Sequence, residues 1–352
     1  MFSSDILFTA QILGERADYA HKRMKSVIDE ISAQVSTTDP KSDVYKLNAA
    51  GVGERVKVGE HTYKLFELSR EYYALTYGAF NCASAPLGEL WHVDASSLAE
   101  YAPQTGLPHK SVPVPEKAQA EAVAAYCDPS LVTAEERDGG YWLVKSDERV
   151  KLDFGGIAKG YAADECVKIL NEYNISSALI DISGNAYFYG DYAGGDGAWN
   201  VGITSPRPRG GETLSSRGYV CAVSVGGNTS AVTSGDYMRY AIHDGADGKP
   251  VYIPHIITPS GVPVGVEYRD GEWVNSDEYV ISATVIGQSS ALCDALSTAV
   301  CALGFEDGAR LLQKSGCKGL IFTEKRYTII GDVQLYRPDV YNGYSEYAFS
   351  EP

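Results

Sequence analysis

The chain has 352 residues, 44% of them hydrophobic and 22% charged, which is typical of a folded protein and excludes extensive disorder. Its formal net charge is -16 and it has no long run of Lys or Arg, so nucleic acid is not expected as a partner. The seven cysteines include no CxxC pair, so a disulfide framework or a zinc site is not supported. Small buried thiols are the simpler interpretation.

The first part of the chain combines helical patterns with a few strands. We expect a strand at 6–13, a long amphipathic helix at 16–35 and a second helix at 60–77. The segment STTDPKSDVYKLN at 36–48 has the composition of a structured loop with a short helical turn. Residues 103–140 mix Pro, Gly and charged residues, which indicates a peripheral excursion around one helix.

From residue 141 onwards strands predominate, and two strong helices at 157–174 and 289–303 interrupt them. The expected strands are 141–145, 149–153, 177–182, 186–189, 199–203, 219–225 and 237–243. Strands with inserted helices, without strict βαβ alternation, predict an α+β fold with a mixed or antiparallel sheet. We expect one domain or two packed lobes over 1–333, followed by a Tyr-rich extension at 334–352.

The first chemical signal is LDFGGIAKGYAADECVKIL at 152–170, a strand-like segment that ends near Asp153, a glycine turn and a helix. Glycines at such a turn let a ligand approach the backbone, and the first helical turn favours an anion. Lys159 lies in that turn and opposes the helix dipole, so it calls for a compensating anion such as phosphate. The alternative is a solvated Lys159 beside Asp164.

The second signal is the helix SSALCDALSTAVCALG at 289–304, which is apolar on one side. Asp294, Ser297 and Thr298 stand at i, i+3 and i+4, so one carboxylate and two hydroxyls share a stripe. Hard oxygen donors of this kind suit Mg²⁺ completed by water and phosphate. An ordinary polar stripe with a solvated Asp294 remains the alternative.

Two further signals are weaker. TSGDYMRY at 233–240 predicts a hydroxyl-rich turn before a strand, and HIITPSGVPV at 255–264 predicts a strand that begins at His255. A lone histidine is most often structural. GAFNCASAPLGELW at 78–91 is rich in small residues and indicates close packing.

Taken in chain order, these segments resemble the ApbE family of FAD:protein FMN transferases. The resemblance extends from the first strand to about residue 332 and also includes the 36–48 loop and the Ser183-Gly184-Asn185 turn. It implies that FAD contacts Ala79, Phe80, Asn81, Asp153, Lys159 and Ile257. It implies Mg²⁺ ligands at Asp294, Ser297, Thr298 and the carbonyl of Gly156, and it places His255 close to the reacting phosphates.

The chain departs from the family pattern at the flavin end. Thr38 stands where many members have Tyr, Asn81 where Asp is usual and Ala83 where Thr is frequent. HIITPSG also lacks the Asp and one residue of the usual HIIDPRTG. We expect looser stacking of the flavin near Thr38, whereas the phosphate and metal positions match the family.

The resemblance implies a Mg²⁺-dependent enzyme that attaches FMN to a Thr or Ser of an acceptor flavoprotein and releases AMP. His255 or Asp294 would assist removal of the proton. The alternatives are an FAD pyrophosphatase at the same site and a non-catalytic flavin-binding protein. Because family members mostly act outside the cytoplasmic membrane, the resemblance implies an extracytoplasmic, membrane-anchored protein. The unpaired cysteines favour the cytoplasmic alternative.

Overall fold

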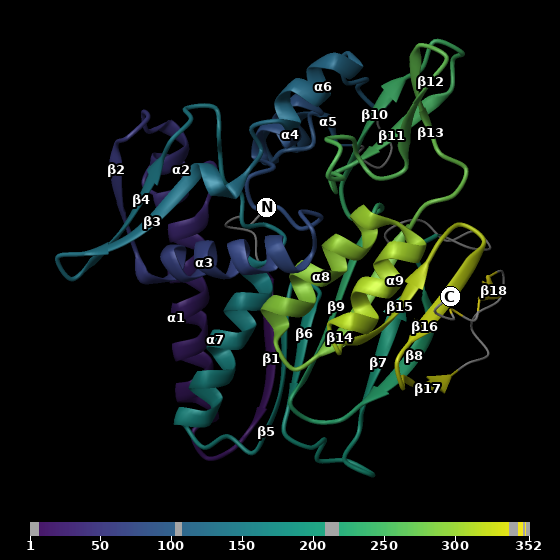
Figure 1. Ribbon diagram of the computed structural model, residues 1–352. Helices are drawn as coiled ribbons and strands as arrows, with labels where there is room; N and C mark the ends of the chain where they lie inside the picture. Colours follow the sequence, from purple (N-terminus) through teal and green to yellow (C-terminus); the bar gives the residue numbers. More distant parts are fainter. Residues whose placement is uncertain (1–6, 103–107, 208–217, 338–343, 348, 350–352) are drawn as a thin grey trace. The chain divides into compact units, whose positions relative to one another are not determined.

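A computed structural model describes residues 7–102, 108–207, 218–337, 344–347 and 349 (Figure 1). The chain divides into two compact units, each assembled from separate stretches of sequence. Unit 1 contains Glu30–Ala158 and Met238–Tyr279, and unit 2 contains Asp5–Asp29, Lys159–Tyr237 and Val280–Pro352. The predicted extension therefore begins inside unit 2, where Gln334–Arg337 forms strand β17.

The main sheet of unit 2 has eight strands in the order β1-β5-β6-β9-β14-β15-β16-β18. Neighbouring strands are antiparallel, except that β16 pairs in parallel with β18. β14 is central and almost wholly buried. The strands are β1 (Phe8–Leu13), β5 (Ser177–Ile182), β6 (Asn185–Tyr189), β9 (Thr229–Gly235), β14 (Ser282–Gly287), β15 (Lys318–Phe322), β16 (Arg326–Ile330) and β18 (Ser345–Glu346).

A smaller sheet and the helices complete unit 2. The smaller sheet has the order β17-β8-β7, with β8 at Tyr219–Val225 and β7 at Trp199–Thr204. Helix α8 packs on β9 and β14, and α9 packs on α8 and β15 (Figure 1). The helices are α7 (Ala158–Glu172), α8 (Ser290–Leu303), α9 (Phe305–Lys314) and α1 (Ala17–Val35), which unit 1 shares.

Unit 1 combines a three-stranded sheet, two hairpins and short helices. Trp91 and Trp273 meet edge to face in its hydrophobic core, with ring centroids 4.9 Å apart. The sheet order is β2 (Arg55–Val58), β4 (Gly140–Lys145), β3 (Val132–Arg137). The hairpins are β10 (Tyr240–Asp244) with β11 (Pro250–Pro254), and β12 (Val266–Arg269) with β13 (Glu272–Asn275). The helices are α2 (Asp43–Ala49), α3 (Glu60–Leu75), α4 (Ala85–Leu90), α5 (Ala95–Tyr101), α6 (Lys117–Ala124) and the 3-10 turn η1 (Pro129–Leu131).

The predicted α+β class is confirmed, and every predicted helix is present. The strand expected at 149–153 is wrong: the Asn48 side chain hydrogen-bonds both the N–H and the C=O of Leu152, so an amide replaces a neighbouring strand. His255 follows β11 instead of beginning a strand, and Ser234 lies inside β9 instead of in a turn before one. In the described part of the chain, no helix has the length and apolar composition needed to span a membrane.

Candidate active site

Asp294 joins the beginnings of α7 and α8 in unit 2. Its side chain is 3% exposed, and its Oδ2 accepts a hydrogen bond of 3.0 Å from the backbone N–H of Gly160. Its Oδ1 lies 3.4 Å from Nζ of Lys159, whose side chain is 17% exposed. Asp294 therefore caps the first turn of α7 and supplies the anion that Lys159 requires there. It is not a solvated carboxylate, and Asp164 is not the partner of Lys159 in the contacts of the described residues.

Asp164, on α7, caps α8 in return. Its carboxylate accepts hydrogen bonds from the N–H of Ser290 at 2.7 Å and of Ala291 at 3.0 Å, and from the Ser289 hydroxyl at 2.9 Å. Burial raises the pKa of Asp164, and the N–H groups of Ala291 and Ser290 oppose that rise. Each helix thus presents a carboxylate to the first turn of the other, which fixes the position of Asp294.

Gly160 allows this close approach of the two helices. A Cβ at this position would lie 2.2 Å from the backbone oxygen of Ser290, so any side chain would force the helices apart. The sequence drew attention to Gly155 and Gly156 at the turn, whereas the closest packing occurs at Gly160. A glycine within a helical pattern was the available signal.

The two predicted hydroxyl ligands lie beside Asp294 and meet a third hydroxyl from β9. Ser297 Oγ and Thr298 Oγ1 donate to the backbone oxygen of Asp294, at 2.9 and 3.3 Å. Ser234 Oγ lies 2.8 Å from Ser297 Oγ and 3.3 Å from Thr298 Oγ1. Because both α8 hydroxyls use their protons on a carbonyl, Ser234 donates its one proton towards them, chiefly to the nearer Ser297. Each α8 hydroxyl then keeps at least one lone pair for a further partner.

This donor set fits Mg²⁺. It offers one carboxylate with unused lone pairs and three hydroxyl oxygens, all hard ligands. Among the described residues, no group of three or more His, Cys, Asp or Glu side chains could hold a metal. The protein therefore supplies few charges, and water and phosphate oxygens would have to complete the coordination. Gly156, the remaining predicted ligand, belongs to unit 1 and lies two residues before α7.

The predicted flavin contacts at 79–81 and 153 lie together in unit 1. Ala79 and Phe80 are buried, and the N–H of Asp153 donates to the backbone oxygen of Cys82 at 2.8 Å. Asn81 donates to the backbone oxygen of Cys127 at 2.7 Å and accepts from the N–H of Ala83. Asp153 accepts from the N–H of Gly155 at 2.7 Å. Both polar side chains hold the backbone of this segment in place.

His255, Ile257 and Thr38 complete the predicted set, also in unit 1. His255 Nδ1 lies 3.0 Å from the backbone oxygen of Arg239. A carbonyl only accepts, so Nδ1 carries a proton and the neutral ring has its basic lone pair on Nε2. Ile257 forms an isolated bridge with Pro263 and packs against the tryptophan core. Thr38 is exposed, and its N–H donates to Ser36 Oγ.

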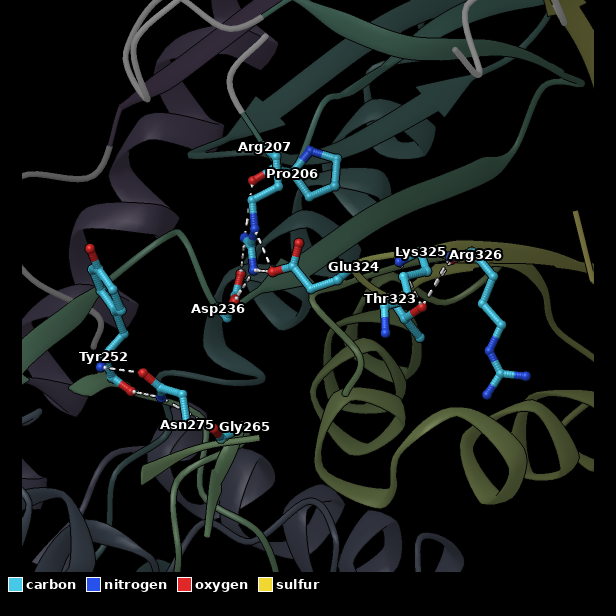
Figure 2. Close-up of polar contacts among 10 residues, drawn as sticks. All are labelled: Pro206, Arg207, Asp236, Tyr252, Gly265, Asn275, Thr323, Glu324, Lys325 and Arg326. Carbon is cyan, nitrogen blue, oxygen red and sulfur yellow. Dashed lines mark hydrogen bonds and ion pairs between the residues drawn. The ribbon is translucent and has the colours of Figure 1, made fainter. Parts of the chain in front are cut away.

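Arg207 binds Asp236, the residue that follows β9 (Figure 2). The sequence patterns did not identify this arginine. Its guanidinium binds the two oxygens of Asp236 at 2.8 and 2.7 Å, and its Nε donates to Glu324 at 2.8 Å. Asp236 is 7% exposed and follows Ser234 by two residues. The bidentate pair anchors the strand that carries the third hydroxyl. Because the three residues are far apart in sequence, no local pattern could have identified them.

Comparison with known proteins points to one family. The sequence model of the ApbE family matches residues 5–321. The chain is 30% identical over 322 residues to the FAD:protein FMN transferase of Treponema pallidum, covering 87% of this chain and 78% of that protein. It is 27% identical over 317 residues to the enzyme of the same name from Klebsiella pneumoniae, covering 90% and 85%. The apo crystal structure of Pseudomonas stutzeri flavinyl transferase ApbE has the same fold, with a TM-score of 0.68, 22% identity and coverage of 95% and 92%.

Proposed function

The chain belongs to the ApbE family, and we propose that it is a Mg²⁺-dependent enzyme that transfers FMN from FAD to a Thr or Ser hydroxyl of an acceptor protein. The observation that carries the proposal is the arrangement around Asp294. The Lys159 ammonium and the Asp294 carboxylate meet at the first turn of α7, where a phosphate group is favoured, and three hydroxyls gather near the backbone oxygen of Asp294. The names of the relatives supply the substrate and the kind of acceptor.

In this proposal Lys159 pairs with Asp294 before FAD binds and with the FAD pyrophosphate afterwards. Without ligand, its charge is balanced by Asp294 at 3.4 Å, which is longer than an optimal charge-assisted hydrogen bond. The FAD pyrophosphate would offer Lys159 a stronger partner, and Asp294 would then be able to bind the metal. Bound at Asp294, Ser297 and Thr298, Mg²⁺ would neutralise phosphate charge and stabilise the AMP leaving group.

The transfer itself exchanges the phosphoanhydride linkage of FAD for a phosphoester linkage to the acceptor. The acceptor hydroxyl oxygen attacks the phosphorus of the FMN half, and the bond from that phosphorus to the bridging oxygen breaks, so AMP leaves with that oxygen. The family resemblance would assign removal of the hydroxyl proton to His255, whose Nδ1 donates to the backbone oxygen of Arg239 so that Nε2 is the basic nitrogen of the neutral ring. We favour His255 over Asp294 as the base because the Asp294 carboxylate accepts from the Gly160 N–H and would bind the metal.

Water as the acceptor would make the same site an FAD pyrophosphatase. One assay separates the possibilities: the protein is incubated with FAD and Mg²⁺, alone and with an acceptor domain that carries a flavinylation threonine. A matched acceptor with its target Thr replaced by Ala is the control. FMN covalently bound to the intact acceptor, with an equal amount of AMP, supports transfer. Soluble FMN and AMP without an acceptor would identify a hydrolase, and unchanged FAD in all arms would leave only flavin binding.

A further inference from the structure

Cys317 differs from the other cysteines of the chain. All seven cysteines are free thiols, and six of them are buried. Burial raises the pKa of Cys82 and of Cys127 to about 12. Cys317 is partly exposed, and a hydrogen bond with the Cys293 thiol lowers its pKa to about 7. At neutral pH a substantial fraction of Cys317 is therefore the reactive thiolate.

Cys317 and Cys293 meet above Gly287, at the end of β14. A Cβ on Gly287 would lie 3.0 Å from both sulfur atoms, so the missing side chain provides the space they share. Cys293 is in the first turn of α8, and Cys317 immediately precedes β15. The two sulfur atoms therefore face the same small gap and lie no more than about 6 Å apart.

We propose that Cys293 and Cys317 form a reversible disulfide that switches off the site at the beginning of α8. The oxidant is an organic hydroperoxide or hydrogen peroxide. The Cys317 thiolate attacks the terminal peroxide oxygen and the O–O bond breaks, which leaves a sulfenic acid on Cys317. The departing alkoxide or hydroxide takes a proton from solvent and leaves as an alcohol or as water. The Cys293 thiol then attacks the sulfenic acid of Cys317, forming the S–S bond and releasing water. A dithiol reverses the step by thiol–disulfide exchange.

The disulfide would act on Asp294, the next residue after Cys293. An S–S bond is about 2.05 Å long, much shorter than a non-bonded contact between two sulfur atoms, so its formation draws the first turn of α8 towards β15. That turn also holds the Asp294 contacts to Gly160 and Lys159. Displacing a catalytic constellation by about 1 Å can cost about 100-fold in rate. We expect a loss of this order on oxidation, an effect that rests on the proposed function.

The test uses the full chain treated with tert-butyl hydroperoxide at pH 7. Peptide mapping identifies the disulfide, and FMN transfer is measured before oxidation, after it and after reduction by dithiothreitol. Cys317→Ser removes the attacking thiol, and Cys127→Ala is the matched control in unit 1. The proposal expects a Cys293–Cys317 disulfide in the wild type and in the control, loss of transfer in both and recovery on reduction. Cys317→Ser should keep its activity through the treatment.

Two results would overturn the inference. One is a set of thiols that remain reduced, or pair differently, under conditions that oxidise a small dithiol. The other is a Cys293–Cys317 disulfide that leaves transfer unchanged. If the reduced wild type transfers no FMN, the proposed function fails separately. The disulfide map and the Mg²⁺-induced change in unfolding temperature of oxidised and reduced protein then decide the inference, because a displaced Asp294 would weaken that change and an undisturbed one would not.

Discussion

Replacing Lys159 by Met should destabilise the protein in the absence of any ligand. The variant keeps most of the side-chain stem but leaves the Asp294 carboxylate, 3% exposed, without its cation. Removing one partner of a fully buried ion pair costs about 3–5 kcal/mol. Here the Nζ–Oδ1 distance is 3.4 Å, Lys159 is 17% exposed and Asp294 keeps the Gly160 N–H, so a smaller loss is expected. We expect a decrease of about 1–2 kcal/mol in the free energy of unfolding.

Thermal unfolding of the ligand-free protein measures this loss. A unit of this size should unfold about 2–8 °C lower in the variant. Lys168→Met is the matched control on the same helix, because Lys168 pairs with Glu165 and its side chain is 65% exposed. That control should change stability by less than about 0.5 kcal/mol. FAD should stabilise the Lys159 variant less than the wild type, whereas riboflavin, which lacks phosphates, should act equally on both. A Lys159→Met protein as stable as its Lys168→Met control would show that the ion pair with Asp294 contributes nothing.

Three further predictions follow from close contacts in the two units. Gly160→Ala should lower the free energy of unfolding in urea by about 1–3 kcal/mol, because its Cβ would lie 2.2 Å from a backbone oxygen. Gly88→Ala, where the nearest atom would be 3.8 Å away, should leave that free energy unchanged or raise it. Equal effects of the two substitutions would contradict the packing argument. Ser234→Ala should lower the apparent Mg²⁺ affinity, measured by Mg²⁺-induced thermal stabilisation, about 10- to 100-fold. Thr233→Val, which lies on the opposite face of β9 against Thr284, should leave that affinity unchanged. A loss of affinity in both variants would indicate general damage to the strand. Alkylation of Cys317 should accelerate as pH rises through about 7, because the thiolate reacts and its pKa is lowered; a midpoint near 9.0 would show an unperturbed thiol.

The sequence predicted the parts of the site that depend on local periodicity. Asp294, Ser297 and Thr298 share a helical stripe, and in the structure Asp294 pairs with Lys159 while both hydroxyls bond to the backbone oxygen of Asp294. A lysine in the first turn of a helix indicated that an anion should lie nearby, but the sequence did not show which one. In the structure the anion beside Lys159 is Asp294, 135 residues away.

Contacts between distant segments could not be predicted in this way. Ser234 reaches α8 only because β9 pairs with β14 beneath that helix. Arg207 reaches Asp236 through the ends of separate strands (Figure 2). The wrong prediction of a strand at 149–153 has the same cause. The segment has the composition of a strand, but the side-chain amide of the distant Asn48 takes the backbone hydrogen bonds of Leu152 that a neighbouring strand would have made. Single-sequence patterns describe one element at a time and carry no information about which elements become neighbours.

The role of Asp294 in metal-dependent FMN transfer is tested most directly by titrating Mg²⁺ against the transfer rate for the wild type and Asp294→Asn, at saturating FAD and acceptor. Asn keeps an oxygen that can accept from the Gly160 N–H, so the cap of α7 is preserved while the charge is removed. Loss of the only carboxylate in the donor set should raise the Mg²⁺ requirement at least about tenfold, and chelation of Mg²⁺ should abolish transfer by the wild type. Identical Mg²⁺ titrations for the two proteins, or wild-type transfer that persists in a chelator, would contradict the account.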